Sequence, residues 1–190
     1  MFERFTGDAR GVVVAAQEYA RRRGERFVGA GHLLLSIVSA DGPVSELLRE
    51  AGLTPAEVAG ALRRVAALDS VDGAALAAIG IDLERVRASL AASFGAAASS
   101  PAARRSGRHF RRRTKDRCGG HIPFSAAAKR CLEQSLRESR LLADHQIGVP
   151  HLALAVLALH DGATVQILRA VGLSAPQLRA AILRRVRSAA

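Results

Sequence analysis

The sequence has few of the features that several protein classes require. Its 190 residues include no tryptophan, one tyrosine and only two cysteines. Two cysteines are too few for the disulfide scaffold of a small secreted protein, and a chain of this length does not need one. Charge begins at Glu3, which argues against a signal peptide. Because no run of about 18 uncharged apolar residues occurs, we expect a cytoplasmic protein without a membrane-spanning helix.

Motifs of several enzyme classes are also missing. The 17 glycines form no Gly-x-x-x-x-Gly-Lys-Ser/Thr loop of the kind that holds nucleotide phosphates. The chain contains neither the Gly-x-Ser-x-Gly motif of serine hydrolases nor the His-Glu-x-x-His motif of zinc proteases. We therefore expect a binding protein without a cofactor. An enzyme whose catalytic residues lie far apart in the sequence is the remote alternative.

What is abundant favours helices, and the helices are repeated. Alanine, leucine and arginine dominate a chain that is 49% hydrophobic. Phe5-Thr6 opens one copy of a repeat and Phe124-Ser125 opens the next. Residues 27–35 match residues 146–154, with glycine, histidine and leucine at the same spacing. Matches that recur in this order indicate an internal duplication.

Each copy is predicted to contain four helices, the first spanning residues 8–23 in one copy and 126–142 in the other. The glycines expected to end helices in the left-handed conformation are Gly24, Gly52 and Gly172. Residues 54–57, Thr-Pro-Ala-Glu, predict a capping box, and residues 174–177, Ser-Ala-Pro-Gln, repeat its pattern. Val58, Ala61, Leu62 and Val65 then form an apolar stripe at helical spacing.

The fold class expected is therefore all-α, with two pseudo-twofold-related four-helix repeats. The repeats span residues 1–66 and 121–190 and are expected to pack as one domain. Residues 67–95 form an extra helical segment, whose helix at about Asp82–Phe94 places Leu83, Val86, Leu90 and Phe94 on one face. Residues 96–120 are predicted to be a flexible basic linker.

The linker accounts for most of the net charge of +11. It holds eight basic residues against one acid, Asp116, so the remainder carries about +4. Arginine runs bind phosphates in a salt-dependent manner, which makes a nucleic-acid-associated protein the alternative function. Only Phe110 offers an aromatic ring for base stacking. We favour a solvated spacer.

The opening of each copy carries the motifs of a known family. In the first copy these are Met1–Thr6, Ala9-Arg10 and the Gly-x-x-His-Leu-Leu-Leu motif that begins at Gly29. In the second they are residues 120–124, Ala128-Lys129 and Leu132-Glu133. Over residues 2–66 and about 120–187 the chain resembles the N-terminal domain of ClpC-type AAA+ protein unfoldases, which is built from two Clp repeats.

In that family the N-terminal domain docks adaptors and substrate proteins for the ATPase motor. The chain ends soon after the second copy, so the resemblance implies a stand-alone Clp-repeat protein that binds but does not unfold. We expect a decoy or adaptor-like protein or peptide binder linked to Clp proteolysis. Its expected partners are substrates, adaptors, a Clp unfoldase or cyclic-peptide antibiotics.

Two groups of residues carry what the resemblance implies about sites. The family motif Gly-Thr-Glu-His supplies a glutamate that helps to bind phosphorylated arginine, and here Gly31 and Pro150 replace it. Neither residue offers a carboxylate, which argues against phosphoarginine recognition. A groove that binds cyclic peptides in the family is kept in Phe2, Phe124, Lys129, Leu132, Glu133 and Leu136. Lys129 and Glu133 are four apart, as are Leu132 and Leu136, so both pairs are predicted to face outward.

The remaining histidines and cysteines are given structural interpretations. His32 and His151 occupy equivalent repeat positions, and we expect both to be buried and hydrogen-bonded rather than catalytic. Cys118, His121 and Cys131, with His109 nearby, match no zinc-site spacing, so no metal site is predicted. Cys131 is expected to be a small buried hydrophobic residue on a helix.

Overall fold

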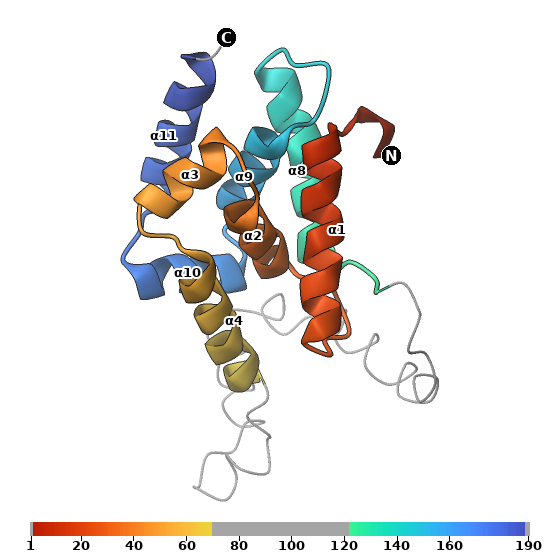
Figure 1. The fold of residues 1–190 in the computed structure, drawn as a ribbon, viewed down its shortest axis with the longest axis vertical. Coiled ribbons are helices and arrows are strands. Elements are labelled where there is room, and N and C mark those ends of the chain that lie inside the picture. The colour runs from red at the N-terminus through yellow and green to blue at the C-terminus, as the bar shows by residue number, and fades with distance from the viewer. Residues whose placement is uncertain (1, 70–121, 189–190) are drawn as a thin grey trace, which may run out of the picture. The chain divides into compact units, whose positions relative to one another are not determined.

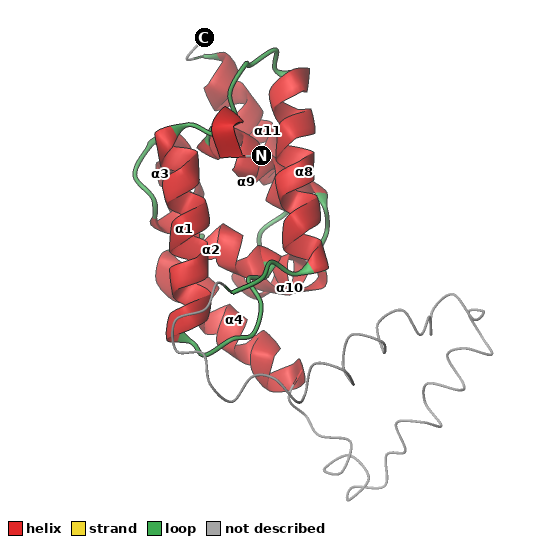
Figure 2. Cartoon of the chain, turned by 90° about the vertical axis from the view of Figure 1, so that its right-hand side faces the viewer, coloured by secondary structure: helices red, strands yellow, loops and turns green. Residues whose placement is uncertain are grey.

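All regular structure in the described part of the chain is helical. The computed structural model describes residues 2–69 and 122–188. The elements are the short 3-10 helix η1 (Phe2–Arg4), α1 (Gly7–Arg22), α2 (Ala30–Ser39), α3 (Pro43–Glu50), α4 (Pro55–Asp69), α8 (Ala126–Leu141), α9 (Val149–Ala158), α10 (Gly162–Val171) and α11 (Ala175–Arg187). Figure 2, with helices in red and loops in green, shows the same composition. The prediction of an all-α fold is confirmed.

The described residues up to Ala66 and from Ile122 form one compact unit. The extra helix predicted at about Asp82–Phe94 and the basic linker at 96–120 lie outside the described residues. The first helix of each repeat begins and ends one residue or less from the predicted limits. Within the described ranges, no single helix is long and apolar enough to cross a membrane; α9 and α10 reach that length only together, across a 95° bend.

Helices α2 and α9 pack against each other at the centre of this unit (Figure 1). Helix α1 covers α2, and α8 covers α9 in the same manner. Further contacts cross between the repeats, since α10 packs on α2, and α3 packs on both α9 and α11. The predicted pseudo-twofold arrangement of two four-helix repeats is therefore confirmed.

The two central helices are buried on all sides. In α2 nine of ten residues are buried, and in α9 seven of ten. The fully buried leucines and isoleucine among them are Leu33, Leu34, Ile37, Leu152, Leu154 and Leu157. Burying one such side chain stabilises the fold by about 1.5–3 kcal/mol relative to exposure. An all-apolar helix of this kind requires cover from every direction, and helices of both repeats supply it.

Two isolated β-bridges connect the repeats reciprocally. Residues 4–6 pair with Ile147 through backbone hydrogen bonds of 2.7 and 3.0 Å. Residues 123–125 pair with Val28 through bonds of 2.9 and 3.0 Å. The segment that leads into each repeat thus satisfies its backbone groups on a loop of the other repeat.

The predicted capping boxes have different outcomes. At Thr54 the box is confirmed, because Glu57 N–H donates to Thr54 Oγ1 and Thr54 N–H donates to the Glu57 carboxylate, both at 3.3 Å. At Ser174 it is wrong, since the serine side chain makes no capping hydrogen bond. A capping side chain accepts from the second or third helical N–H; Pro176 removes the second donor, and the third, Gln177 N–H, does not bond to Ser174. In the first repeat Pro55 occupies the first helical position, where no donor is lost.

The glycines predicted to end helices do so in the left-handed conformation. Gly24, Gly52 and Gly172 have φ values of +66°, +98° and +72°. The position equivalent to Gly24 in the second repeat is Ala143, with φ +58°. The same hydrogen bonds close both helix ends, as Ala143 N–H donates to Arg140 O at 3.1 Å. The Cβ of an alanine makes this conformation costly, so Ala143 is a strained helix end.

Replacing Ala143 with glycine is expected to stabilise the protein by about 1 kcal/mol, because the left-handed penalty disappears and the exposed methyl group makes no core contact. Urea denaturation followed by circular dichroism measures the change. Gly24→Ala is the matched control and is expected to destabilise by a similar amount. Equal stability of wild type and Ala143→Gly would show that this helix end is not strained.

Candidate functional site

A pocket of about 510 Å³ opens between the N-terminal segment and α8. We call it the α8 pocket. Its apolar lining residues are Phe5, Leu132, Leu136 and Ile147, and its charged lining residues are Glu3, Arg4, Glu133, Arg137 and Arg140. The apolar residues are buried or half-buried, whereas all five charged residues are exposed. The pocket therefore has an apolar floor and a charged rim.

Helical periodicity and one β-bridge bring these residues together. Five of them, from Leu132 to Arg140, recur at spacings of one, three or four positions along α8, and so form one stripe on the helix. The opposite wall is the segment of residues 3–5, which the bridge to Ile147 holds in place. The pocket is thus built from both repeats.

The structure places five of the six predicted groove side chains, and their surroundings differ. Leu132, Glu133 and Leu136 line the α8 pocket together. Lys129 is exposed in the first turn of α8 and does not line the pocket, and Phe124 is half-buried beside its β-bridge with Val28. The side chain of Phe2 lies outside the described part of the structure.

One part of the groove prediction is wrong. Leu132 does not face outward, because it is only 8% exposed and belongs to the hydrophobic core. It shares the buried face of α8 with Ala128 and Cys131. Lys129 and Glu133 are both exposed as predicted, but among the described residues neither makes an ion pair.

His32 and His151 are buried and hydrogen-bonded, as predicted. The backbone N–H of Gly29 donates to His32 Nδ1 at 3.0 Å, and that of Gly148 donates to His151 Nδ1 at 2.9 Å. Since Nδ1 accepts, the neutral ring carries its proton on Nε2. A carboxylate oxygen lies 3.2 Å from His32 Nε2, and one lies 3.0 Å from His151 Nε2. Each ring therefore supplies one half of a capping box, in which the side chain at the third helical position accepts the N–H of the N-cap residue.

The surroundings of these rings favour their neutral form. Burial lowers the pKa of His32 and outweighs the nearby Glu25 carboxylate, which raises it. Burial lowers the pKa of His151 in the same way against the opposing effect of Asp144. Protonation would also place a proton on Nδ1, where the ring now accepts the glycine N–H. Both rings are thus coupled to the starts of α2 and α9.

The free energy of unfolding is expected to fall as the pH drops below about 6.5, because the unfolded histidines take up protons before the folded ones do. The double variant His32→Gln, His151→Gln keeps an acceptor for each glycine N–H and should flatten this dependence. Urea denaturation at about pH 7.5 and about pH 5.5 tests the prediction. The control is His145→Gln, His160→Gln, at two exposed positions, which should retain the wild-type dependence. An unchanged slope in the first variant would contradict this account.

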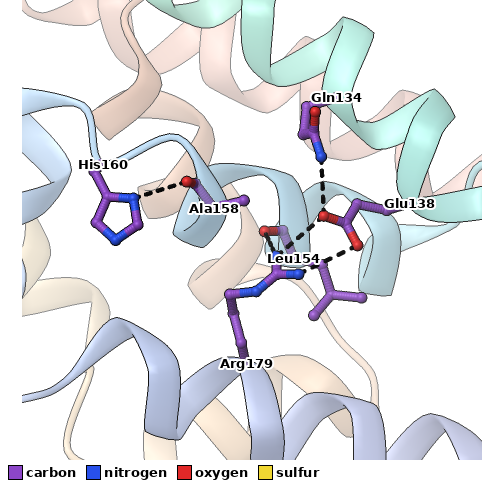
Figure 3. Close-up of polar contacts among 6 residues, drawn as sticks. All are labelled: Gln134, Glu138, Leu154, Ala158, His160 and Arg179. Atoms are coloured by element: carbon purple, nitrogen blue, oxygen red, sulfur yellow. Dashed lines mark hydrogen bonds and ion pairs between the residues drawn. The ribbon is translucent and has the colours of Figure 1, made fainter. Parts of the chain in front are cut away.

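A buried ion pair in the second repeat was missed by the sequence analysis. Arg179 of α11 reaches Glu138 of α8 at 3.1 Å and also donates to the carbonyl of Leu154 in α9, while Gln134 Nε2 donates to Glu138 (Figure 3). The side chain of Glu138 is 4% exposed and that of Arg179 is 26% exposed. The only sequence signal for this ion pair was the position of an acid, Glu138, on the buried face of α8. The equivalent first-repeat residues are Tyr19 and Ala59.

Arg179→Ala is expected to destabilise the protein by about 3 kcal/mol, because it leaves a buried carboxylate without its cation. The double variant Glu138→Tyr, Arg179→Ala installs the first-repeat pair and should recover most of this loss. Thermal or urea denaturation measures both. If the double variant were as unstable as the single one, the ion pair would not explain the cost of losing Arg179.

The family positions that lack glutamate have a packing explanation in one repeat. A Cβ atom on Gly31 would lie 2.5 Å from Leu62 Cδ2 and 3.4 Å from Ile167 Cδ1. No larger residue fits unless Leu62 moves, so Gly31 permits close contact of α2 with α4 and α10. Pro150 occupies the first turn of α9, where its missing N–H costs nothing. Neither position presents a carboxylate.

Cys131 is fully buried, as predicted, and burial raises the pKa of its thiol to about 12. A thiol in this state is unreactive. His109, Cys118 and His121, which were considered with Cys131 as a metal set and rejected, lie outside the described residues. Within the described ranges, no group of three histidine, cysteine, aspartate or glutamate residues could hold a metal ion.

Comparison with known proteins confirms the resemblance predicted from the motifs. Residues 4–73 match the model of the Clp repeat (R) N-terminal domain family. The chain is 30% identical over 186 residues to the chloroplastic chaperone protein ClpC1 of Oryza sativa subsp. japonica, and 29% identical over 187 residues to a ClpA homolog of Cyanidium caldarium. These matches cover 98% of the chain but 16% and 17% of the relatives, so the chain spans about one sixth of their length. Since relatives include chloroplastic proteins, the cytoplasmic location stays a prediction.

Solved structures show the same fold. The N-terminal domain of ClpD from Arabidopsis thaliana matches with a TM-score of 0.55 at 21% identity, covering 98% of this chain and 97% of that domain. The Hsp104 N-terminal domain from Candida albicans matches with a TM-score of 0.58 at 15% identity, covering 95% and 90%. At these identities the likeness extends to the fold alone.

Proposed function

We propose that this chain, which carries a Clp repeat N-terminal domain, is a non-catalytic module that binds proteins or peptides in connection with Clp proteolysis. Its binding surface is the α8 pocket. In this role it captures a substrate segment, an adaptor or a cyclic peptide. It thereby acts as a decoy that competes with the N-terminal domain of an unfoldase, or as an adaptor-like partner.

The observation that carries the proposal is the shared location of Leu132, Glu133 and Leu136. These residues were selected by resemblance to a ligand groove, and they line a pocket that also includes Phe5 and Ile147. An apolar floor with a charged rim is the usual composition of a peptide-binding site. A volume of about 510 Å³ accommodates one or two large side chains rather than a folded domain.

We do not propose phosphoarginine recognition for this chain, because it lacks the glutamates of the Gly-Thr-Glu-His motif. Gly31 and Pro150 supply no carboxylate for a guanidinium group, and a larger residue at position 31 would require Leu62 to move. The proposal therefore assigns binding to the α8 pocket and leaves out the phosphoarginine function of the resembling domains. Phe2, Phe124 and Lys129 stay proposed ligand contacts.

Leu136→Asn should weaken binding of a cyclic peptide that recognises ClpC-type N-terminal domains by tenfold or more, because burying a leucine side chain contributes about 1.5–3 kcal/mol. Calorimetric titration of the full chain measures the dissociation constant. The matched control is Leu141→Asn, which makes the same change on the same helix at a residue that is 78% exposed and outside the pocket.

Binding that survives Leu136→Asn, or that falls equally in Leu141→Asn, would rule out the α8 pocket as the ligand site. Circular dichroism of both variants confirms that the helices remain folded. A chain lacking residues 96–120 should bind the peptide as the full chain does. Loss of peptide binding in that chain would instead assign recognition to the arginine-rich segment.

A further inference from the structure

The charged side chains on the rim of the α8 pocket are exposed and have no ion-pair partner among the described residues. None of the side chains of Glu3, Arg4, Glu133, Arg137 and Arg140 makes a hydrogen bond or ion pair with another described residue. Elsewhere on the same unit, Arg21 and Arg22 lie within 3.7 Å of Glu18. The rim arginines therefore have their donors available to a ligand.

Among the three charged residues of α8 that line the pocket, the acid precedes the two arginines. Glu133 precedes Arg137 by about one helical turn, and Arg140 follows in the last turn of the helix. Glu3 and Arg4 line the opposite wall, beside the bridge between residues 4–6 and Ile147. The pocket thus has a cationic side at the C-terminal end of α8.

We propose that the α8 pocket selects peptides in which a carboxylate lies next to a large apolar side chain. This inference rests on the proposed peptide-binding function and specifies its ligand class. The apolar side chain occupies the floor formed by Leu132 and Leu136. The carboxylate lies between Arg137 and Arg140, and Arg4 approaches it from the facing wall.

The physical chemistry of guanidinium groups supports this class. Each arginine offers several N–H donors in one plane, and a carboxylate accepts two of them at once. A peptide that covers the floor also removes water from the rim, which strengthens these bonds. Glu133, at the other end of the stripe, disfavours a second carboxylate and is free to accept a peptide N–H. A cationic ligand is disfavoured because the rim carries three arginines against two glutamates.

The experiment uses three labelled peptides that share a Leu-Phe-Leu centre, carry amidated C-termini and differ only in flanking Glu, Gln or Lys residues. Fluorescence anisotropy with the full chain is expected to show about tenfold tighter binding of the Glu peptide than of the Gln peptide at about 50 mM salt. The difference should shrink at about 500 mM salt, since exposed charges are screened. A Gln peptide with a free C-terminus distinguishes a side-chain carboxylate from a chain-terminal one.

The double variant Arg137→Gln, Arg140→Gln should bind the Glu peptide only as tightly as the Gln peptide, with affinity for the Gln peptide unchanged. Arg130→Gln, Arg169→Gln removes the same net charge from exposed positions outside the pocket and should keep the preference. A preference that persists in the first variant or disappears in the control overturns the inference.

If the wild type binds all three peptides equally and Leu136→Asn abolishes this binding, the carboxylate preference is overturned. The proposed peptide-binding function then still stands. Failure of every linear peptide and of the cyclic peptide to bind overturns both. These two results are distinguishable, because Leu136→Asn reports on the floor and the arginine variants report on the rim.

Discussion

The contact between α2 and α9 is the constraint on which the rest of the structure depends. Both helices are too apolar to face water, and each is covered by helices of both repeats. The reciprocal packing of α10 on α2 and α3 on α9 solves this problem for both at once. The pseudo-twofold symmetry follows from that exchange, as do the β-bridges that anchor each leading segment on the other repeat.

The shape of the α8 pocket also depends on contacts between the two repeats. One wall is the stripe on α8 and the other is the N-terminal segment, which is held by Ile147. Ile147 directly precedes Gly148, whose N–H is bound by the buried ring of His151. The bridge, the pocket wall and the helix cap therefore all lie within residues 147–151. The geometry of the binding surface thus depends on the buried hydrogen bond between Gly148 and His151.

The sequence predicted those features that local chemistry determines. Glycines at helix ends, the box at Thr54 and the buried histidines follow from repeated motifs, and self-comparison revealed the symmetry. Features that depend on a partner far along the chain were not predictable: the inward direction of Leu132, the ion pair of Glu138 with Arg179, and the bridge to Ile147. Spacing places Leu132 and Leu136 on one side of a helix, but only the packing of α8 on α9 determines how deeply each is buried. The groove residues beyond the described pocket stay predictions.

The contacts between the repeats also determine when the core can form during synthesis of the chain. A ribosome delivers α2 first, and about 110 residues separate its end from the start of α9. At about 5–20 residues per second, this nascent helix waits on the order of ten seconds for its cover. During that interval a nearly continuous apolar surface is exposed outside the ribosome. A chain of this design therefore depends on early shielding of its first half, by helix α1 or by the chaperones that meet emerging chains.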